Sequence, residues 1–258
     1  MNDTSLPVLM YHGLHATAQS RGRFESVYSV APEEFSAQLD WLLQAGYRSM
    51  RLDDLQANGP ETKPVVITFD DGDVSNVEVA LPLLRERGMV AEFFVTSDFI
   101  DCAGMLTRAD VRALSDAGMG VQSHGQSHRY LEDLDAGALA DELGNSKRLI
   151  EELTGRIVDA LALPGGRGGE RERQDALRQG YRYLFNSAPG SNRHWQRGQY
   201  LQRITLTRGL ALAAFADMVA WRGIRPRVAQ MRYNALAMPK KLLGNRRYEQ
   251  LRTRLLRQ

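Results

Sequence analysis

Residues 65–72 read Val-Val-Ile-Thr-Phe-Asp-Asp-Gly, an apolar run that ends in two adjacent carboxylates and a glycine. Such a run is typical of a strand buried on both faces in a parallel sheet. His124 and His128 follow about fifty residues later, after the strand candidate Met119-Gly-Val-Gln-Ser. Both motifs are therefore expected at the carboxyl ends of strands, where α/β barrels build their active sites.

These side chains can form a metal site. Two neighbouring ionised aspartates repel each other, and a bound cation removes the repulsion. Asp71, His124 and His128 provide the three protein ligands of a catalytic site of the zinc type, with one position left open for water. Asp70 would then lie beside that water as a general base. A second interpretation stays open, because an Asp after a strand can also cap a helix that begins near Val74.

Three segments resemble the first three motifs of the polysaccharide deacetylases of carbohydrate esterase family 4, also called the chitooligosaccharide deacetylase homology domain. They are Thr68-Phe-Asp-Asp-Gly72, Ser123-His-Gly-Gln-Ser-His128 and Leu161-Ala-Leu-Pro-Gly-Gly166, and the resemblance covers roughly residues 5–210. It implies an α/β fold, a single distorted (β/α) barrel. It also implies metal-dependent removal of an N-acetyl group from an amino sugar of a polysaccharide or lipid-linked glycan, which releases acetate.

The resemblance assigns roles to the motif residues. In that family the first aspartate is the general base, and the second aspartate and two histidines bind the metal. Carried over, Asp70 is the base, and Asp71, His124 and His128 hold one divalent ion. Zinc is the expected ion, with cobalt, manganese and nickel as alternatives.

The general acid of the family usually comes from a histidine late in the chain, but residues 200–210 contain none. Tyr11-His12 resembles a Tyr-His segment near the amino end of periplasmic poly-N-acetylglucosamine deacetylases. We therefore expect His12 to be the acid, since a histidine can deliver a proton near neutral pH. The alternative is a histidine that closes a surface turn. His15 lacks this context and is expected to face solvent.

The third motif departs from the family pattern. Members often have an arginine two residues before the motif's proline, where it orients the base, and Ala162 occupies that position. Arg167 is a candidate replacement or substrate contact, although a solvated arginine fits equally well. Gly165 matches the position whose backbone N–H helps to hold an oxyanion. A plain glycine-rich turn is the other interpretation.

Length and hydrophobic patterning fit one barrel over residues 1–221. The chain has 258 residues, 43% of them hydrophobic, and strand and helix patterns alternate, which predicts a mainly parallel sheet. Expected strands are Val8–Tyr11, Val65–Phe69, Val90–Val95, Met119–Ser123, Ile157–Leu163 and Tyr183–Phe185, and expected helices are Pro32–Ala45, one through Val77 and Leu84, Thr107–Ala117 and Asp135–Leu153.

The sequence shows no signal peptide or membrane span, so we expect a cytoplasmic protein or one at the inner face of the membrane. The first residues lack a basic n-region and an apolar h-region. No stretch reaches the roughly 18 apolar residues of a membrane span. Cys102 is the one cysteine, so an intrachain disulfide is excluded.

Residues 222–258 form a basic carboxyl-terminal extension. They carry eleven Lys or Arg and one acid, Glu249, a net charge of +10, whereas the preceding residues have 22 basic and 30 acidic side chains, a net of −8. Leucines interleave with the basic residues from Lys240 to Leu256, as in an amphipathic helix on an anionic membrane. Packing of the apolar face on the barrel is the alternative.

Other functions compete with glycan deacetylation. A related metal amidohydrolase acting on another N-acyl or cyclic amide substrate would keep the same four metal-site residues. A catalytically inactive glycan-binding module is the non-enzyme alternative, but binding alone does not need a base beside a metal. No nucleic-acid partner is expected, because no recognisable motif accompanies the basic tail.

Overall fold

The computed structural model describes residues 5–55, 63–193 and 196–235. Its strands pair in parallel in the order β8-β7-β6-β5-β4-β3-β1-β9, with β2 also paired to β3. Their bounds are β1 Val8–Tyr11, β2 Tyr47–Ser49, β3 Lys63–Phe69, β4 Glu92–Val95, β5 Gly120–Ser123, β6 Ala160–Ala162, β7 Tyr183–Phe185, β8 Tyr200–Leu201 and β9 Ile204–Thr205.

The sheet curls into a distorted barrel. β8 and β9 lie at opposite ends of the path of paired strands, yet only Gln202 and Arg203 separate them in the chain. β8 pairs with β7, and β9 pairs with β1. Residues 200–205 therefore bridge the two ends of the sheet, and the expected barrel is confirmed.

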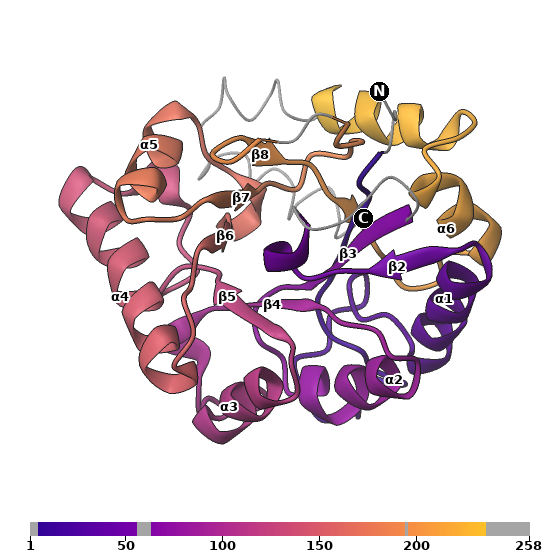
Figure 1. Cartoon of the computed structure of the whole chain (residues 1–258), viewed down its shortest axis with the longest axis horizontal. Helices are drawn as coiled ribbons and strands as arrows, with labels where there is room; N and C mark the ends of the chain where they lie inside the picture. Colours follow the sequence, from indigo (N-terminus) through magenta and orange to yellow (C-terminus); the bar gives the residue numbers. More distant parts are fainter. Residues whose placement is uncertain (1–4, 56–62, 194–195, 236–258) are drawn as a thin grey trace, which may run out of the picture.

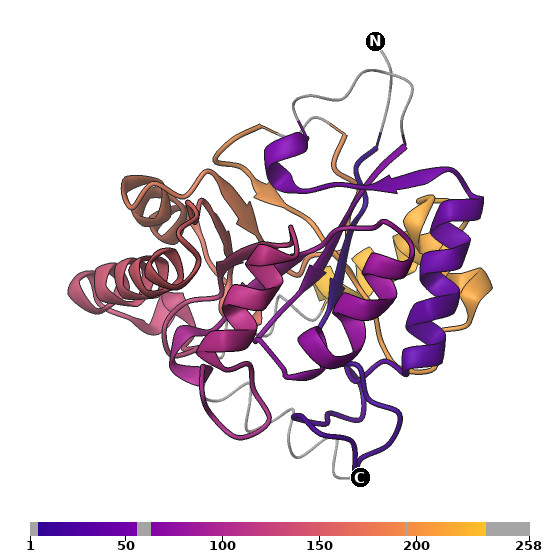
Figure 2. The same cartoon turned by 60° about the horizontal axis from the view of Figure 1, so that its bottom comes forward.

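Helices surround the strands (Figures 1 and 2). Local sequence sets several of their ends: Thr107 accepts a hydrogen bond from the Asp110 N–H, and Asp135 accepts one from the Ala138 N–H. The helices are α1 Pro32–Gln44, a π-helical turn Asn76–Ala80 that continues into α2 Leu81–Glu86, α3 Arg108–Asp116, α4 Ala136–Thr154, α5 Glu170–Arg178 and α6 Leu212–Val219.

β1, β3, β4, β6 and β7 divide their side chains between two apolar clusters. In β3, Ile67 and Phe69 pack in the cluster that includes the helices, whereas Val66 belongs to a second cluster with Val8 and Phe94. Successive residues of a strand point to opposite faces. The second cluster therefore marks the barrel interior, and Thr68 and Asp70 follow Val66 on that face.

All the predicted strands and helices are present, with ends that differ by a few residues. Sequence periodicity did not indicate β2, β8, β9, α5 or α6. These three strands are only two or three residues long, and α5 is strongly charged. Within the described ranges, no helix is both long enough and apolar enough to cross a membrane. Residues 225–235 are helical, but the predicted amphipathic pattern from Lys240 to Leu256 lies outside the described residues.

Candidate active site

Strand register brings three predicted site residues together. His12, Asp70 and His124 each follow a strand, in phase with interior positions such as Val8 and Val66. β1 pairs Val8 with Val66 and Met10 with Thr68, which brings His12 level with Asp70. The Asp70 N–H donates to Tyr11 O at 2.9 Å, and the His124 N–H donates to Val95 O at 2.9 Å. The carboxyl end of the barrel therefore carries all three side chains.

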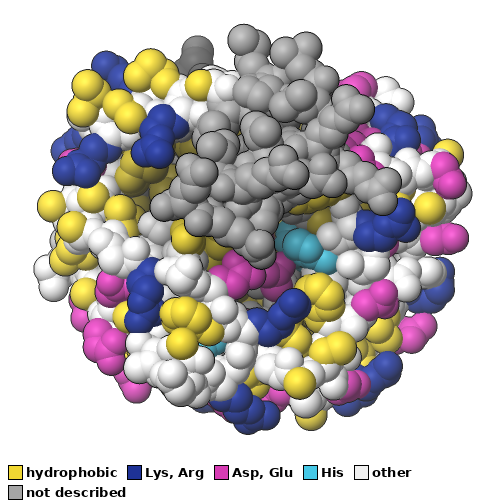
Figure 3. All heavy atoms as spheres, turned by 180° about the vertical axis from the view of Figure 1, so that it is seen from behind, with side chains coloured by type: hydrophobic (Ala, Val, Ile, Leu, Met, Phe, Trp, Pro, Cys, Tyr) yellow, Lys and Arg dark blue, Asp and Glu magenta, His cyan; other side chains and the backbone are white. Residues whose placement is uncertain are grey.

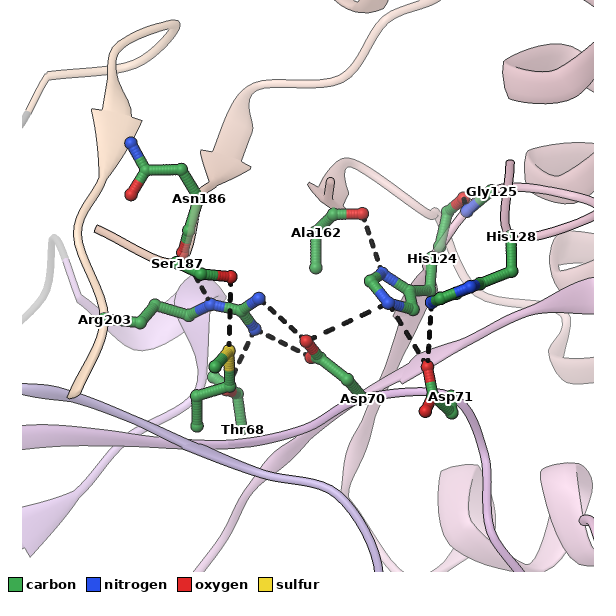
Figure 4. A network of polar contacts seen from close by, with 12 residues as sticks. Thr68, Asp70, Asp71, His124, Gly125, His128, Ala162, Asn186, Ser187 and Arg203 are labelled. Carbon is green, nitrogen blue, oxygen red and sulfur yellow. Dashed lines mark hydrogen bonds and ion pairs between the residues drawn. The ribbon is translucent and has the colours of Figure 1, made fainter. Parts of the chain in front are cut away.

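Asp71, His124 and His128 form the candidate metal site (Figure 4). Asp71 Oδ1 lies 3.4 Å from His124 Nε2 and 3.2 Å from His128 Nε2, and one ligand atom from each residue falls within 4.8 Å of the others. Asp71 Oδ1 is buried and has no hydrogen-bond partner among the described residues. Because imidazole lone pairs and a carboxylate oxygen repel one another, three such atoms in one place fit a divalent cation.

Backbone strain marks two of these ligands. Asp71 has φ 72° and His128 has φ 62°, in the left-handed region that non-glycine residues rarely adopt. Each such residue costs of order 1–3 kcal/mol and persists where the surrounding structure over-determines it. Here the strained backbone occurs at Asp71 and His128, whose side chains approach each other from two different loops.

A backbone carbonyl sets the orientation of His124. Its Nδ1 lies 2.9 Å from the carbonyl oxygen of Ala162, a distance that fits donation by the Nδ1–H. This leaves the Nε2 lone pair directed at Asp71 (Figure 4). Metal-binding histidines commonly have such a partner on the second nitrogen.

Helix α4 supports the loop from His124 to His128. Glu142, 6% exposed, accepts hydrogen bonds from the Ser127 N–H and Oγ, both at 2.7 Å. A Cβ at Gly125, which has φ 78°, would approach Glu142 Oε1 to 2.9 Å. Glycine at this position therefore lets the loop pass close to the carboxylate that anchors it.

Asp70 forms a bidentate ion pair with Arg203. The two guanidinium nitrogens Nη1 and Nη2 each lie 2.7 Å from a different carboxylate oxygen, and Arg203 is fully buried (Figure 4). Arg203 Nε also donates to the Asn186 carbonyl at 2.9 Å. The planar guanidinium thus fixes the carboxylate plane, which a lysine could not do.

Sequence analysis missed Arg203. The interpretation of Arg167 as the replacement for the missing arginine is wrong, because the guanidinium that pairs with Asp70 comes from Arg203. Arg167 lies instead with its guanidinium carbon 4.1 Å from the centre of the Tyr130 ring. The available signal was an arginine between two short apolar segments, within residues 200–210. Two-residue strands are too short to reveal it by periodicity.

The electrostatics keep both aspartates ionised. Burial works to raise the pKa of Asp70, but the charges of Arg203 and His124 outweigh it and lower that pKa. Burial likewise opposes ionisation of Asp71, yet His124 and His128 hold its pKa well below the usual range. Burial works to lower the pKa of His124, while Asp70 and Asp71 raise it overall.

His12 lies in the same cleft, while His15 does not behave as expected. The His12 ring stacks on Tyr28 with centroids 4.8 Å apart, and its Nδ1 is buried without a hydrogen-bond partner in the described part of the chain. The expectation that His15 faces solvent is wrong. His15 is fully buried, 2.9 Å from Ser29 Oγ and 3.3 Å from Asp73 Oδ1, because the chain after β1 folds back over Asp73.

The site opens into a cleft of about 450 Å³. Figure 3 shows acidic and histidine side chains side by side at a hollow near the middle of this face. Gly165, with φ 62°, borders the cleft, and a Cβ there would come within 2.4 Å of the Tyr130 ring. The lining residues are Met10, His12, Glu25, Tyr28, Asp70, Asp71, His124, His128, Tyr130, Gly165, Gly166, Arg167, Ser187, Thr205 and Tyr233.

Comparison with known proteins identifies the family. Residues 57–184 match the family described as polysaccharide deacetylase. The chain carries a polysaccharide deacetylase domain. The chain is 28% identical over 219 residues to the putative polysaccharide deacetylase YxkH of Bacillus subtilis. The aligned region covers 83% of this chain and 76% of that protein. The family match to residues 57–184 contains Asp70, Asp71, His124 and His128 but neither His12 nor Arg203.

Solved structures share the fold of this deacetylase domain. The deacetylase PplD of Streptococcus pyogenes, solved in complex with acetate, has a TM-score of 0.75 and 23% identity, with 83% of this chain and 98% of that chain covered. IcaB of Ammonifex degensii has a TM-score of 0.69 and 22% identity, with 88% and 97% covered. The barrel is therefore that of known deacetylases.

Proposed function

We propose that this protein is a metal-dependent hydrolase that removes the N-acetyl group from an amino sugar of a glycan. The observation that carries the proposal is the ionised Asp70, locked by Arg203 beside the convergent Asp71, His124 and His128. A carboxylate with a fixed plane next to an open metal site is the arrangement that water-activating hydrolysis requires. The family match and the acetate complex of PplD support the same chemistry.

Asp71, His124 and His128 would hold the ion. One carboxylate and two imidazoles are a ligand set that suits zinc. A bound divalent ion polarises an acyl oxygen and lowers the pKa of water. Asp70 accepts the proton of the attacking water through an oxygen oriented by Arg203. The backbone N–H of Gly165 is proposed to donate to the oxygen that becomes negative.

His12 is proposed to donate a proton to the amide nitrogen as the carbon–nitrogen bond breaks. The water oxygen ends on the acyl carbon, so the products are acetate and a free amino sugar. His12 is well placed for this role, because it borders the cleft level with Asp70 and is held by stacking on Tyr28.

Acetate release tests the proposal directly. Purified protein is incubated with N-acetylglucosamine oligomers and with lipid-linked acetamido sugars, with and without a chelator. Release that stops with chelator and returns with zinc is expected, and equal release in both conditions would refute metal dependence. Elemental analysis should find about one ion per chain in the wild type and none in a His124→Ala, His128→Ala double variant.

The leaving group tests His12. His12→Ala should lower turnover of the N-acetyl sugar about 10²- to 10⁴-fold, because the amine leaves only when protonated. Cleavage of an aryl acetate should change far less, since a phenolate leaves without a proton. His15→Ala is a poor control because His15 is buried, so the two substrates serve as each other's control. Equal losses on both substrates would return His12 to a structural role.

We also propose that the substrate is lipid-linked or lies near a membrane, which the charge of residues 222–258 supports. Co-sedimentation with anionic and neutral vesicles, for the full chain and a chain ending at residue 222, tests this. If the full chain does not bind anionic vesicles at low salt, the membrane proposal is wrong and the proposed glycan deacetylation is unaffected.

A further inference from the structure

The helical residues 225–235 follow the barrel and turn one face toward it. Among them, the buried or half-buried positions are Pro226, Ala229, Gln230 and Tyr233. Their spacing of three, one and three residues puts them on one side of a helix. Met231, 62% exposed, points away from that side. The segment therefore packs along the barrel, and Tyr233 lies farthest along its inner face.

Tyr233 reaches the active-site cleft. It borders the same 450 Å³ space as His12, Asp71 and His128, although it is more than a hundred residues from the metal-site loops in the chain. Burial raises the pKa of the Tyr233 phenol, and the nearby charges of Arg167 and Glu132 act on it in opposite directions. The charged groups that act on Asp71 are instead His124, His128 and His12. Tyr233 and Arg167 thus line the same cleft as the metal-site residues.

The part of the cleft lined by Tyr130 and Arg167 has the chemistry of a sugar platform. The Arg167 guanidinium lies over the Tyr130 ring, and Tyr233 adds a second aromatic side chain to the lining of the cleft. Aromatic rings pack against the C–H face of a pyranose, while phenol hydroxyls and guanidinium N–H groups hydrogen-bond to its hydroxyls. The cleft volume falls in the range of about 300–1,000 Å³ that small-molecule sites occupy.

We propose that Tyr233, from the segment after the barrel, contacts the sugar adjacent to the one that loses its acetyl group, and so sets a preference for oligosaccharides over a single sugar. This inference rests on the proposed function, because it names a contact in the same glycan site. It makes the carboxyl-terminal segment part of the substrate site and gives Tyr233 a role in binding, not in the chemical step.

Turnover of two substrates provides the first test. For the N-acetylglucosamine tetramer, Tyr233→Ala should raise KM about 3- to 10-fold, the loss expected for one aromatic contact, and leave kcat nearly unchanged. For the single sugar, neither constant should change. Tyr233→Phe should retain most of the effect of the ring, and Met231→Ala, two residues away on the exposed side, should behave as wild type. Equal KM for the tetramer in wild type and Tyr233→Ala would overturn the inference.

Calorimetry separates this inference from the proposed function. The tetramer is titrated into chelator-treated full-length wild type, Tyr233→Ala and Met231→Ala, in which binding is measured without turnover. Weaker binding in Tyr233→Ala alone supports the contact even if no acetate is ever released, in which case only the proposed reaction falls. Acetate release with identical tetramer affinities keeps the reaction and removes the Tyr233 contact. If no variant binds the tetramer, the inference is wrong.

Discussion

Asp70 and Glu92 are buried carboxylates at opposite ends of the same barrel interior, and their pKa values move in opposite directions. Asp70, 2% exposed, lies after the carboxyl end of β3, and its pKa is lowered. Glu92, 1% exposed, begins β4, and burial raises its pKa to about 7, against the smaller effects of the Leu52 N–H and Arg51. The two carboxyl groups are almost equally buried, so burial alone does not determine whether each is ionised.

The partners explain the difference. Asp70 receives two hydrogen bonds from a buried guanidinium, whereas Glu92 Oε1 accepts a single backbone N–H, from Leu52 at 2.9 Å. A full positive charge in contact offsets the cost of burying a carboxylate, whereas the Leu52 N–H, the charge of Arg51 and the Gln122 amide together do not. The carboxyl end of the barrel thus holds a carboxylate that is ionised at neutral pH, and the opposite end holds a carboxyl group that is protonated over much of the acidic range.

Exchange of each carboxyl group for its amide should have the largest effect and the clearest contrast. Asp70→Asn removes the proposed proton acceptor but none of the candidate metal ligands, so turnover should fall about 10²- to 10⁴-fold while metal content is retained. Glu92→Gln, the matched change at the other end, should leave kcat/KM as in wild type. Similar activity losses in both variants would show that the two ends of the barrel do not differ in function.

Breaking the ion pair from the arginine side should destabilise the fold. Arg203→Met leaves Asp70 buried without its counter-ion, which typically costs about 3–5 kcal/mol in the free energy of unfolding. The Asp70→Asn, Arg203→Met double variant removes both charges and should recover part of that loss. Urea unfolding measures both values. Equal stability of wild type and Arg203→Met would mean that Asp70 is solvated or protonated, and the contrast with Glu92 would disappear.

The residues of the site and the groups that orient them differ in how well the sequence predicted them. Asp70, Asp71, His124 and His128 were predictable because each motif directly follows a strand, so short-range order fixes where the side chains meet. Their exact partners were less so: the Ala162 carbonyl that orients His124 comes from β6, and nothing in that residue type indicates the role.

Arg203 shows what one sequence does not reveal. Its position depends on the closure of the barrel through β8 and β9, which are two residues each and carry no periodic signal. The same holds for His15, where burial depends on the chain folding back over Asp73, and for Tyr233, where it depends on how the segment after the barrel packs. In each case the decisive contact joins parts of the chain that are distant in sequence, and local patterns do not encode such contacts.

The pH dependence of stability should show the smallest effect and should isolate Glu92. Its pKa is about 7 in the folded protein and 4.5 for an exposed glutamate, so the folded state binds more protons between these values. The free energy of unfolding therefore decreases as pH rises through this window, by up to about 3 kcal/mol from a shift of this size. Glu92→Gln keeps the shape of the side chain and its acceptor for the Leu52 N–H but cannot ionise. Urea unfolding of wild type and Glu92→Gln at pH 4.5, 6 and 7.5 should give curves that converge at the lowest pH and separate above it, with the variant more stable. Parallel pH profiles for the two proteins would show that Glu92 ionises at its ordinary pKa, and the opposite pKa shifts of the two carboxylates would be refuted.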